Sequence, residues 1–222
     1  MTIQIAIDGP ASSGKSTIAK QIARQLNIAY VDSGAIYRTI TYALLENNIQ
    51  PNDSEAIKEQ LQQFDIELMA DQDYFEVRLN QQPIGLEIRS EQVTAAVSEV
   101  SAYPFVREYV NHKLQQLSRN HSVIMDGRDI GTVVLPEAEV KIFLTASAEV
   151  RAQRRYEENK QRNQLTQSYE DILQAIIERD RYDSNRKIAP LRKAEDAIEV
   201  DTSNLTVEEV VNKVISMIQP QL

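Results

Sequence analysis

The stretch Ile3-Gln-Ile-Ala-Ile-Asp-Gly-Pro-Ala-Ser-Ser-Gly-Lys-Ser-Thr17 decides the fold of this chain. It begins with a short apolar, β-branched run, and residues 9–16 then fit the pattern G-x-x-x-x-G-K-S/T. A segment of helical periodicity follows, with Ile18, Ile22 and Leu26 on one face. The order of strand, glycine-containing loop and helix is typical of a phosphate-binding loop and not of an ordinary turn.

The chemistry of this loop suits a polyphosphate. Its glycines permit close backbone approach, and its N–H groups can converge on an anion together with the donors at the helix start. Lys15 supplies a positive charge for the outer phosphates, and the Ser16 hydroxyl can bind Mg²⁺. We therefore predict a site for Mg²⁺ and a nucleoside triphosphate. Its predicted triphosphate contacts are Gly9, Pro10, Ala11, Ser12, Ser13, Gly14, Lys15, Ser16 and Thr17.

Length and composition restrict the class of protein. The chain has 222 residues, enough for one core with a small inserted lobe, and its 42% hydrophobic and 26% charged residues are typical of a globular protein. A net charge of −9 argues against a surface for nucleic acid or anionic membranes. The lack of cysteine excludes disulfides and thiolate metal sites. No stretch resembles a signal peptide or a membrane span, so we expect a cytoplasmic location.

Strand and helix patterns alternate along most of the chain, which predicts an α/β fold with a five-stranded parallel sheet flanked by helices. The strands are expected near Ile3, Ala29, Val123, Val140 and Ile198. Residues 64–79 instead alternate apolar and polar side chains on both sides of a turn at 71–73, which predicts an antiparallel hairpin, and a helix follows. We interpret residues 63–102 as a small α+β lobe inserted into a single domain that spans residues 1–222.

Polar residues at the carboxyl ends of the predicted strands are candidate ligand contacts, because open α/β sheets bind ligands at that edge. Asp32 could hold a water on Mg²⁺, and Arg38 could reach an anion near the start of the next helix. An equally weighted alternative is that Ser33 only caps this helix and that Arg38 is solvated. Residues 126–129, Asp-Gly-Arg-Asp, follow the third strand; they could form a polar turn with internal salt bridges, but their placement favours a functional role.

Arginines gather in two further segments. Arg151, Arg154 and Arg155 project to one side of a helix that Ser147 can cap. The polar stretch 157–167 that follows is interpreted as a mobile flap, so residues 148–168 form the predicted helical lid. A second cluster lies between residues 179 and 186. Arginines from several places suit phosphoryl transfer between two anionic substrates, where catalysis is mostly positioning and charge neutralisation.

The chain resembles the bacterial cytidylate kinase (CMP kinase) family of P-loop nucleoside monophosphate kinases over essentially its whole length. The resemblance rests on the motifs at residues 8–17, 32–38, 126–134 and 179–191, in order and spacing. It implies that the chain transfers the γ-phosphoryl group of ATP to CMP or dCMP, a phosphate acceptor, and that the inserted lobe binds the monophosphate. Ser12 and Ser13 stand where the family commonly has Ala or Gly.

The resemblance also implies residue roles. The implied catalytic residues are Lys15, Arg128, Arg151 and Arg155. The implied substrate contacts are Ser33, Arg38, Ser98, Arg107, Arg128, Asp129, Arg179, Asp183 and Arg186. Ser98, Arg107 and Asp129 would read cytosine, whose O2 and N3 accept and whose N4 donates hydrogen bonds, whereas uracil reverses the pattern at N3 and O4. The predicted metal residues are Ser16 and Asp32.

We expect a monomer in pyrimidine nucleotide metabolism that acts on small molecules, without nucleic-acid or membrane partners. One alternative is a monophosphate kinase for another base. A second is a nucleotide-dependent switch, which would need a guanine-specificity segment such as Asn-Lys-x-Asp after a late strand, where residues 145–148 read Thr-Ala-Ser-Ala. A nucleic-acid-dependent NTPase is a third alternative, and the net charge of −9 argues against it.

Overall fold

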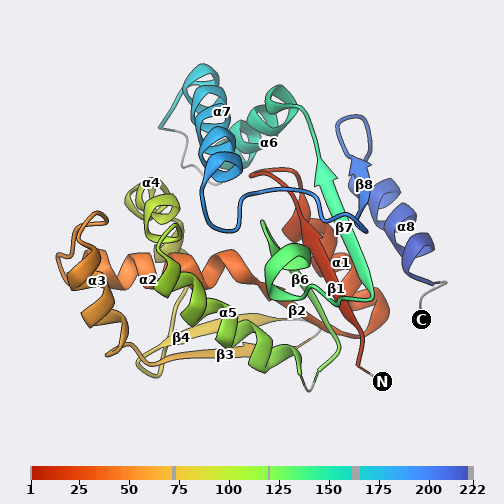
Figure 1. Ribbon diagram of the computed structural model, residues 1–222. Coiled ribbons are helices and arrows are strands. Elements are labelled where there is room, and N and C mark those ends of the chain that lie inside the picture. Colours follow the sequence, from red (N-terminus) through yellow and green to blue (C-terminus); the bar gives the residue numbers. More distant parts are fainter. Residues whose placement is uncertain (1, 72–73, 120, 162–165, 220–222) are drawn as a thin grey trace. The chain divides into compact units, whose positions relative to one another are not determined.

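The computed structural model of the chain (Figure 1) describes residues 2–71, 74–119, 121–161 and 166–219. The chain forms two compact units. The first unit contains residues 1–4 and 23–125, and the second contains residues 5–22 and 126–222. No helix within the described ranges combines the length and the apolar character needed to span a bilayer.

A five-stranded parallel sheet forms the centre of the fold, as predicted. Its strand order is β2-β6-β1-β7-β8. The strands are β1 (Gln4–Asp8), β2 (Ala29–Asp32), β6 (Val123–Gly127), β7 (Val140–Thr145) and β8 (Ile198–Asp201). Ile5 lies opposite Val140, and Ile142 lies opposite Ile198, both in parallel register. The apolar residues of β1 are fully buried, as expected for a central strand covered on both faces.

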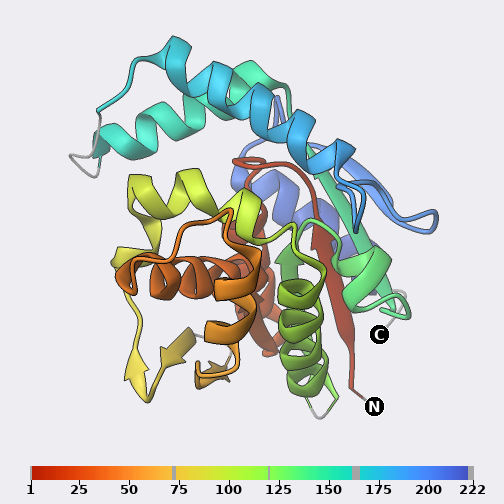
Figure 2. The same ribbon diagram turned by 60° about the vertical axis from the view of Figure 1, so that its left-hand side comes forward.

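The second unit carries the loop after β1 and the helices of the C-terminal part of the chain. Its elements are the start of α1 (Lys15–Leu26), the π-helix η2 (Ile130–Val134), α6 (Ala148–Gln161), α7 (Tyr169–Asn185) and α8 (Val207–Ile218). Helices α6 and α7 lie side by side in both views (Figures 1 and 2), with Ala152, Ile172 and Ile176 buried between them. Ser147 caps α6, because its hydroxyl accepts a hydrogen bond from Val150 N at 3.3 Å, as predicted.

The first unit contains the predicted hairpin. Its helices are α2 (Ser33–Glu46), α3 (Ser54–Leu61), η1 (Leu86–Arg89), α4 (Glu91–Val100) and α5 (Pro104–Ser118), and its small antiparallel sheet consists of β3 (Ile66–Ala70), β4 (Phe75–Leu79) and β5 (Gln82–Pro83). Leu68 pairs with Val77 in this sheet. Part of the turn predicted at 71–73 lies outside the described residues. The hairpin contacts β2 and α2 within the same unit, and the lobe boundaries of 63–102 stay a prediction.

Some elements differ from the expectation. Helix α3, the short helices η1 and η2, and strand β5 were not predicted. Helix α3 has only eight residues and buries two, Ile57 and Leu61, so its apolar period is weak. Helix α6 continues to Gln161, so the first part of the polar stretch 157–167 is helical. Its interpretation as a mobile flap stays a prediction. Residues 162–165 lie outside the described residues, and the lid boundaries of 148–168 stay a prediction.

Candidate active site

The loop between β1 and α1 has the backbone of a phosphate-binding loop. Gly9 has φ +148° and Gly14 has φ +92°, backbone conformations that residues other than glycine rarely adopt. A Cβ built at Gly9 would lie 2.1 Å from the carbonyl oxygen of Leu144 on β7. The amide of Ile18 donates to Gly14 O at 3.0 Å and so starts the helix. Both glycines of the sequence motif are therefore required by the shape of the loop.

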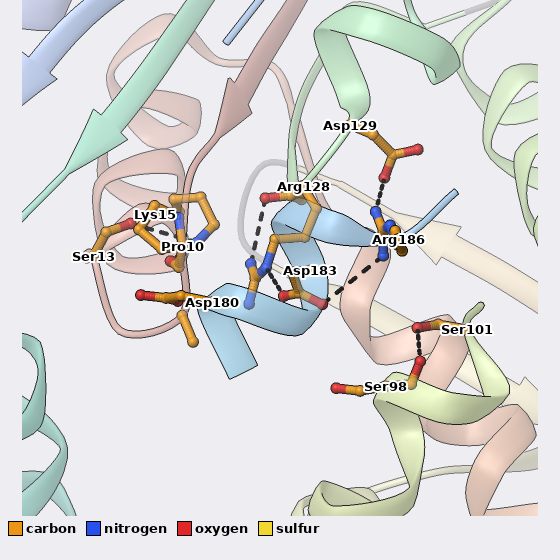
Figure 3. Close-up of polar contacts among 12 residues, drawn as sticks. Pro10, Ser13, Lys15, Ser98, Ser101, Arg128, Asp129, Asp180, Asp183 and Arg186 are labelled. Atoms are coloured by element: carbon orange, nitrogen blue, oxygen red, sulfur yellow. Dashed lines mark hydrogen bonds and ion pairs between the residues drawn. The ribbon is translucent and has the colours of Figure 1, made fainter. Parts of the chain in front are cut away.

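Lys15 lies buried beneath its own loop, with 5% of its surface exposed. Its ammonium donates to Pro10 O at 2.6 Å and to Ser13 Oγ at 3.4 Å (Figure 3), and both of these oxygens are uncharged. Burial, followed by the positive charge of Arg128, lowers the pKa of Lys15 well below its usual value, while Asp126 and Asp8 act in the opposite direction. An anion bound at the loop would restore the preference of this side chain for its charged form.

Four predicted site residues form one chain of ion pairs within the second unit. Arg128 Nε lies 3.1 Å from Asp183 Oδ2, and Arg186 Nη1 lies 4.0 Å from Asp183 Oδ1 (Figure 3). Arg186 Nη2 continues the chain to Asp129 Oδ1 at 3.4 Å. The structure thus brings the Asp-Gly-Arg-Asp segment after β6 together with the end of α7. The alternative that the segment pairs only within its own turn is wrong for both Arg128 and Asp129.

Arg179 adds a further cation, which is partly buried. Its Nε is buried and has no hydrogen-bond partner among the side chains and backbone that the structure describes. Burial, followed by the charge of Arg128, lowers the pKa of Arg179 to about 10. Lys15, Arg128 and Arg179 therefore repel one another within a poorly solvated region of the second unit.

The donor set beside the loop fits Mg²⁺. Ser16 Oγ donates to Asp126 Oδ2 at 3.0 Å, which places a hydroxyl and a carboxylate together. Mg²⁺ takes oxygen ligands, and in phosphoryl-transfer sites it is usually held by one or two protein groups plus the phosphates. Asp126 was not among the predicted metal residues, although its position at the carboxyl end of β6 could have identified it.

Asp32 has a defined role in the first unit. Its Oδ1 accepts a hydrogen bond from Ala35 N at 3.0 Å, so Asp32 is the N-cap of α2. Its Oδ2 accepts from Arg89 Nη2 at 3.1 Å. The alternative that Ser33 caps this helix is wrong, because Ser33 is the buried first residue of α2. The contact of Asp32 with a magnesium-bound water stays a prediction.

The other predicted residues of the first unit are held by neighbouring segments. Arg38 Nη1 donates to Thr94 Oγ1 at 2.9 Å and to a carbonyl of η1, so the alternative of a freely solvated side chain is wrong. Arg107 is buried, donates to Ser101 O at 3.0 Å and lies 5.4 Å from the ring centre of Tyr37. The hydroxyl of Ser101 also donates to Ser98 O at 3.1 Å (Figure 3). Ser98 and Arg107 are thus linked through Ser101, and their joint action with Asp129 of the second unit stays a prediction.

Two of the three arginines of α6 contact the phosphate loop, and the third contacts a threonine that is itself hydrogen-bonded to the loop. Arg151 Nη1 donates to Ala11 O at 3.3 Å, and Arg155 Nε donates to Ser12 Oγ at 3.3 Å. Arg154 binds Thr202, whose hydroxyl lies 3.3 Å from Ser13 O. The prediction that these arginines share one side of the helix is confirmed.

Asp8 is a site residue that the sequence analysis did not single out. Its carboxylate accepts hydrogen bonds from Ile130 N at 2.8 Å and Gly131 N at 2.7 Å. These amides begin η2, immediately after Arg128 and Asp129. Asp8 therefore ties the start of the phosphate loop to the segment that carries two predicted substrate contacts.

The sequence comparisons with known proteins point to one family. The family profile described as cytidylate kinase matches residues 5–220. A protein named cytidylate kinase from Halalkalibacterium halodurans is 46% identical to this chain, and the match covers 99% of each protein. A protein of the same name from Fervidobacterium nodosum is 49% identical, and the match covers 99% of this chain and 97% of the relative. The crystal structure of an uncharacterized protein from Eubacterium ventriosum matches with a TM-score of 0.54 at 13% sequence identity. The match covers 98% of this chain and 99% of the other chain, and it shows a shared fold alone.

Alanine substitutions at Gly9 and Gly14 should affect stability for different reasons, because a Cβ would clash with backbone at Gly9 and would meet only an unfavourable φ at Gly14. Gly9→Ala should destabilise the protein more than Gly14→Ala, because only the first brings a Cβ to 2.1 Å from a backbone oxygen. We expect Gly14→Ala to cost about 1–2 kcal/mol through its positive φ. Thermal unfolding of both variants checks this order, and equal losses would contradict it.

The stability of the protein should depend on the protonation of Asp8. Burial raises the pKa of Asp8 from 3.8 to about 6, although its two backbone amide donors and Lys15 favour the charged form. Because the folded-state pKa is the higher one, the stabilising contribution is complete below pH 3.8 and is lost as the pH rises through about 6. Between pH 3.8 and about 6, the free energy of unfolding of the wild-type protein should therefore fall by roughly 3 kcal/mol relative to that of Asp8→Asn.

Carbon-13 NMR titration of the Asp8 carboxyl group measures this pKa directly. Asp196 is the matched control, because its hydrogen bond from Lys141 lowers the pKa of Asp196. A midpoint for Asp8 at or below that of an ordinary aspartate would refute the prediction.

Proposed function

The chain belongs to the cytidylate kinase family, and we propose from this premise that it transfers the γ-phosphoryl group of ATP to CMP and dCMP. The products are ADP and CDP or dCDP. The observation that carries the proposal is the crowding of Lys15, Arg128 and Arg179 in the second unit, where burial and mutual repulsion lower the pKa of two of the three. Two phosphorylated substrates would bring the negative charge that such a group of cations binds.

The phosphate loop would hold the donor. Its backbone N–H groups and Lys15 would contact the β- and γ-phosphates of ATP, and Gly9 and Gly14 allow that close approach. Mg²⁺ held by Ser16 and Asp126 would offset phosphate charge and fix the orientation of the triphosphate. Lys15 would exchange its contacts with uncharged oxygens of the loop for charge-assisted contacts with phosphate.

The acceptor would need orientation but no general base. At neutral pH the phosphate of CMP already carries unprotonated oxygens, so one of them can attack the γ-phosphorus without a proton transfer. The bond from the γ-phosphorus to the β–γ bridging oxygen then breaks and leaves ADP. Arg128 and Arg179 would neutralise charge on the acceptor and the transferred group, which is the main protein contribution in phosphoryl transfer.

Ser98, Arg107 and Asp129 are proposed to select cytosine. An arginine facing O2 and N3 and a carboxylate facing N4 would satisfy the base, whereas uracil would place an N–H against Arg107 and a carbonyl against Asp129. The fixed orientation of Arg107, held by Ser101 O and the Tyr37 ring, supports this role. Mispaired buried polar groups discriminate strongly between ligands of similar size.

We further propose that the protein acts in the cytoplasm in pyrimidine nucleotide metabolism. The reaction consumes ATP and supplies pyrimidine diphosphates, so it belongs where the intracellular ATP pool is available. The proposed partners are small molecules only. The expectation of a monomer stays a prediction that light scattering can test.

A coupled assay of ADP release across CMP, dCMP, UMP, AMP and GMP tests the proposed function. We expect efficient turnover of CMP and dCMP, with UMP at least about a hundredfold less efficient, because a site built on hydrogen bonds rejects a base that mispairs with it. Turnover of UMP as efficient as that of CMP would overturn the cytosine assignment. Efficient turnover of AMP or GMP alone would instead favour a monophosphate kinase for another base.

The role of Asp129 has its own test. Asp129→Ala should weaken CMP binding by about ten- to a hundredfold and should change ATP binding little, because the lost group would face the base of the acceptor. Calorimetric titration with each nucleotide measures both affinities. Glu208→Ala, at an exposed position in the first turn of α8, is the control. Equal losses for CMP and ATP would contradict the role.

A further inference from the structure

Residues 187–191, Lys-Ile-Ala-Pro-Leu, fold back against the end of α7 and form a return segment. We propose that Ala189 in this segment is a positioning residue for the reaction. Its backbone carbonyl holds the guanidinium of Arg186 in the orientation that contacts the acceptor nucleotide. This inference rests on the proposed function and on the predicted contact between Arg186 and the substrate.

The return segment is bound to the end of α7 at two points. Helix α7 ends at Asn185, and Arg186 follows it with an extended backbone, φ −63° and ψ 144°. Arg186 Nε donates to Ala189 O at 2.5 Å. Leu191 N donates to Asp183 O at 2.9 Å, and the side chain of Leu191 is buried. The segment therefore supports both predicted substrate contacts at this end of the helix, Asp183 and Arg186.

Ala189 has a strained backbone. Its φ is +47°, in a region that residues with a side chain rarely adopt. Pro190 follows it, and a proline favours an extended conformation in the residue before it. Packing of the preceding residues does not explain the strain, because Lys187 is exposed and Ile188 is 42% exposed. Strain of this kind persists only where neighbouring contacts maintain it, and the two hydrogen bonds to the end of α7 supply that support.

The carbonyl of Ala189 makes the shortest of three contacts of the Arg186 guanidinium. This contact is 2.5 Å long, whereas the distances to Asp129 Oδ1 and Asp183 Oδ1 are 3.4 and 4.0 Å. Charge-assisted hydrogen bonds to a carboxylate are usually about 2.7–2.9 Å long, so both carboxylate contacts are loose. The N–H groups of a guanidinium have fixed directions in one plane. Holding Nε therefore sets that plane and directs Nη1 and Nη2 toward the two carboxylates (Figure 3).

The orientation of this plane matters for an anionic substrate. Arginine binds phosphate best through two parallel N–H groups, which requires the guanidinium to face both oxygens at once. A guanidinium turned about its own axis would keep its charge and lose this paired geometry. Ala189 takes no part in making or breaking bonds, so the loss of its carbonyl should weaken acceptor binding more than it slows the chemical step.

Ala189→Val should raise the KM for CMP by about tenfold and leave the KM for ATP within about twofold of the wild-type value. The physical reason is that a β-branched residue resists a positive φ and would withdraw the carbonyl from Arg186. Steady-state kinetics with each nucleotide varied in turn measures both constants. Ala189→Gly should raise the KM for CMP much less than Ala189→Val, because glycine adopts this φ without strain. An equal rise in the two variants would overturn the proposal.

Asn48→Val is the matched control for strain alone. Asn48 has φ +57°, is exposed and lies just after α2. The substitution should lower the melting temperature, as Ala189→Val does, and should leave the KM for CMP within about twofold of wild type. A tenfold rise in this control would show that lost stability, and not the orientation of Arg186, determines the KM.

A double variant tests whether Ala189 acts through Arg186. In an Arg186→Met background, Ala189→Val should change the KM for CMP by no more than about twofold, because the side chain that it positions is already gone. A further tenfold rise in that background would overturn the proposal. If Ala189→Val does not fold, Arg186→Lys decides the question, because lysine keeps the charge and lacks the planar Nε–H group.

Arg186→Lys should raise the KM for CMP by about tenfold, and a wild-type KM in this variant would overturn the proposal. The two levels of inference fail differently. A wild-type protein that does not phosphorylate CMP would refute the proposed function itself. An active wild type together with an unchanged KM for CMP in Ala189→Val would refute the role of Ala189 alone.

Discussion

The close approach of Gly9 to the carbonyl oxygen of Leu144 is the constraint on which the site depends. An added Cβ would lie 2.1 Å from that oxygen, so the chain can leave β1 along this route only because residue 9 is glycine. Asp8, the residue before it, accepts hydrogen bonds from two amides of η2. The phosphate loop and the segment bearing Arg128 and Asp129 are thus attached to one rigid point. Catalysis by positioning requires a fixed reference of this kind.

Charge is distributed unequally around that point. Arg128, Asp183, Arg186 and Asp129 alternate in sign and largely balance one another through ion pairs. Lys15 and Arg179 are different, because burial and the charge of Arg128 lower the pKa of both. The balanced residues can keep their geometry in the folded protein by themselves. The crowded cations gain the most from phosphate, which is why the second unit is suited to binding anions and to stabilising charge during transfer.

Much of this organisation could be predicted from local sequence. The strand, loop and helix around the P-loop motif, the alternation of strands and helices and the hairpin pattern each depend on side-chain periodicity within a short window. Asp8 could not be assigned in this way, because its bond to the amide of Ile130 joins residues 122 positions apart. The first two amides of the π-helix η2 donate their hydrogen bonds to Asp8, so the start of this helix also involves a residue that is distant in the sequence. The alternative that Ser33 caps α2 differed from the structure by one residue, because Asp32 and Ser33 are both good cap formers.

The crowding of Lys15, Arg128 and Arg179 also has a practical consequence for handling the protein. Sulfate and inorganic phosphate share the charge and the acceptor oxygens of a nucleotide phosphate, so these common buffer ions should compete for the same cations. By mass action, an anion that binds only the folded chain raises the melting temperature in proportion to the logarithm of its concentration. Stabilities measured in sulfate or phosphate buffers would therefore include ion binding, and affinities for nucleotides would be underestimated there. Buffers built on bulky, weakly coordinating anions report the properties of the polypeptide itself.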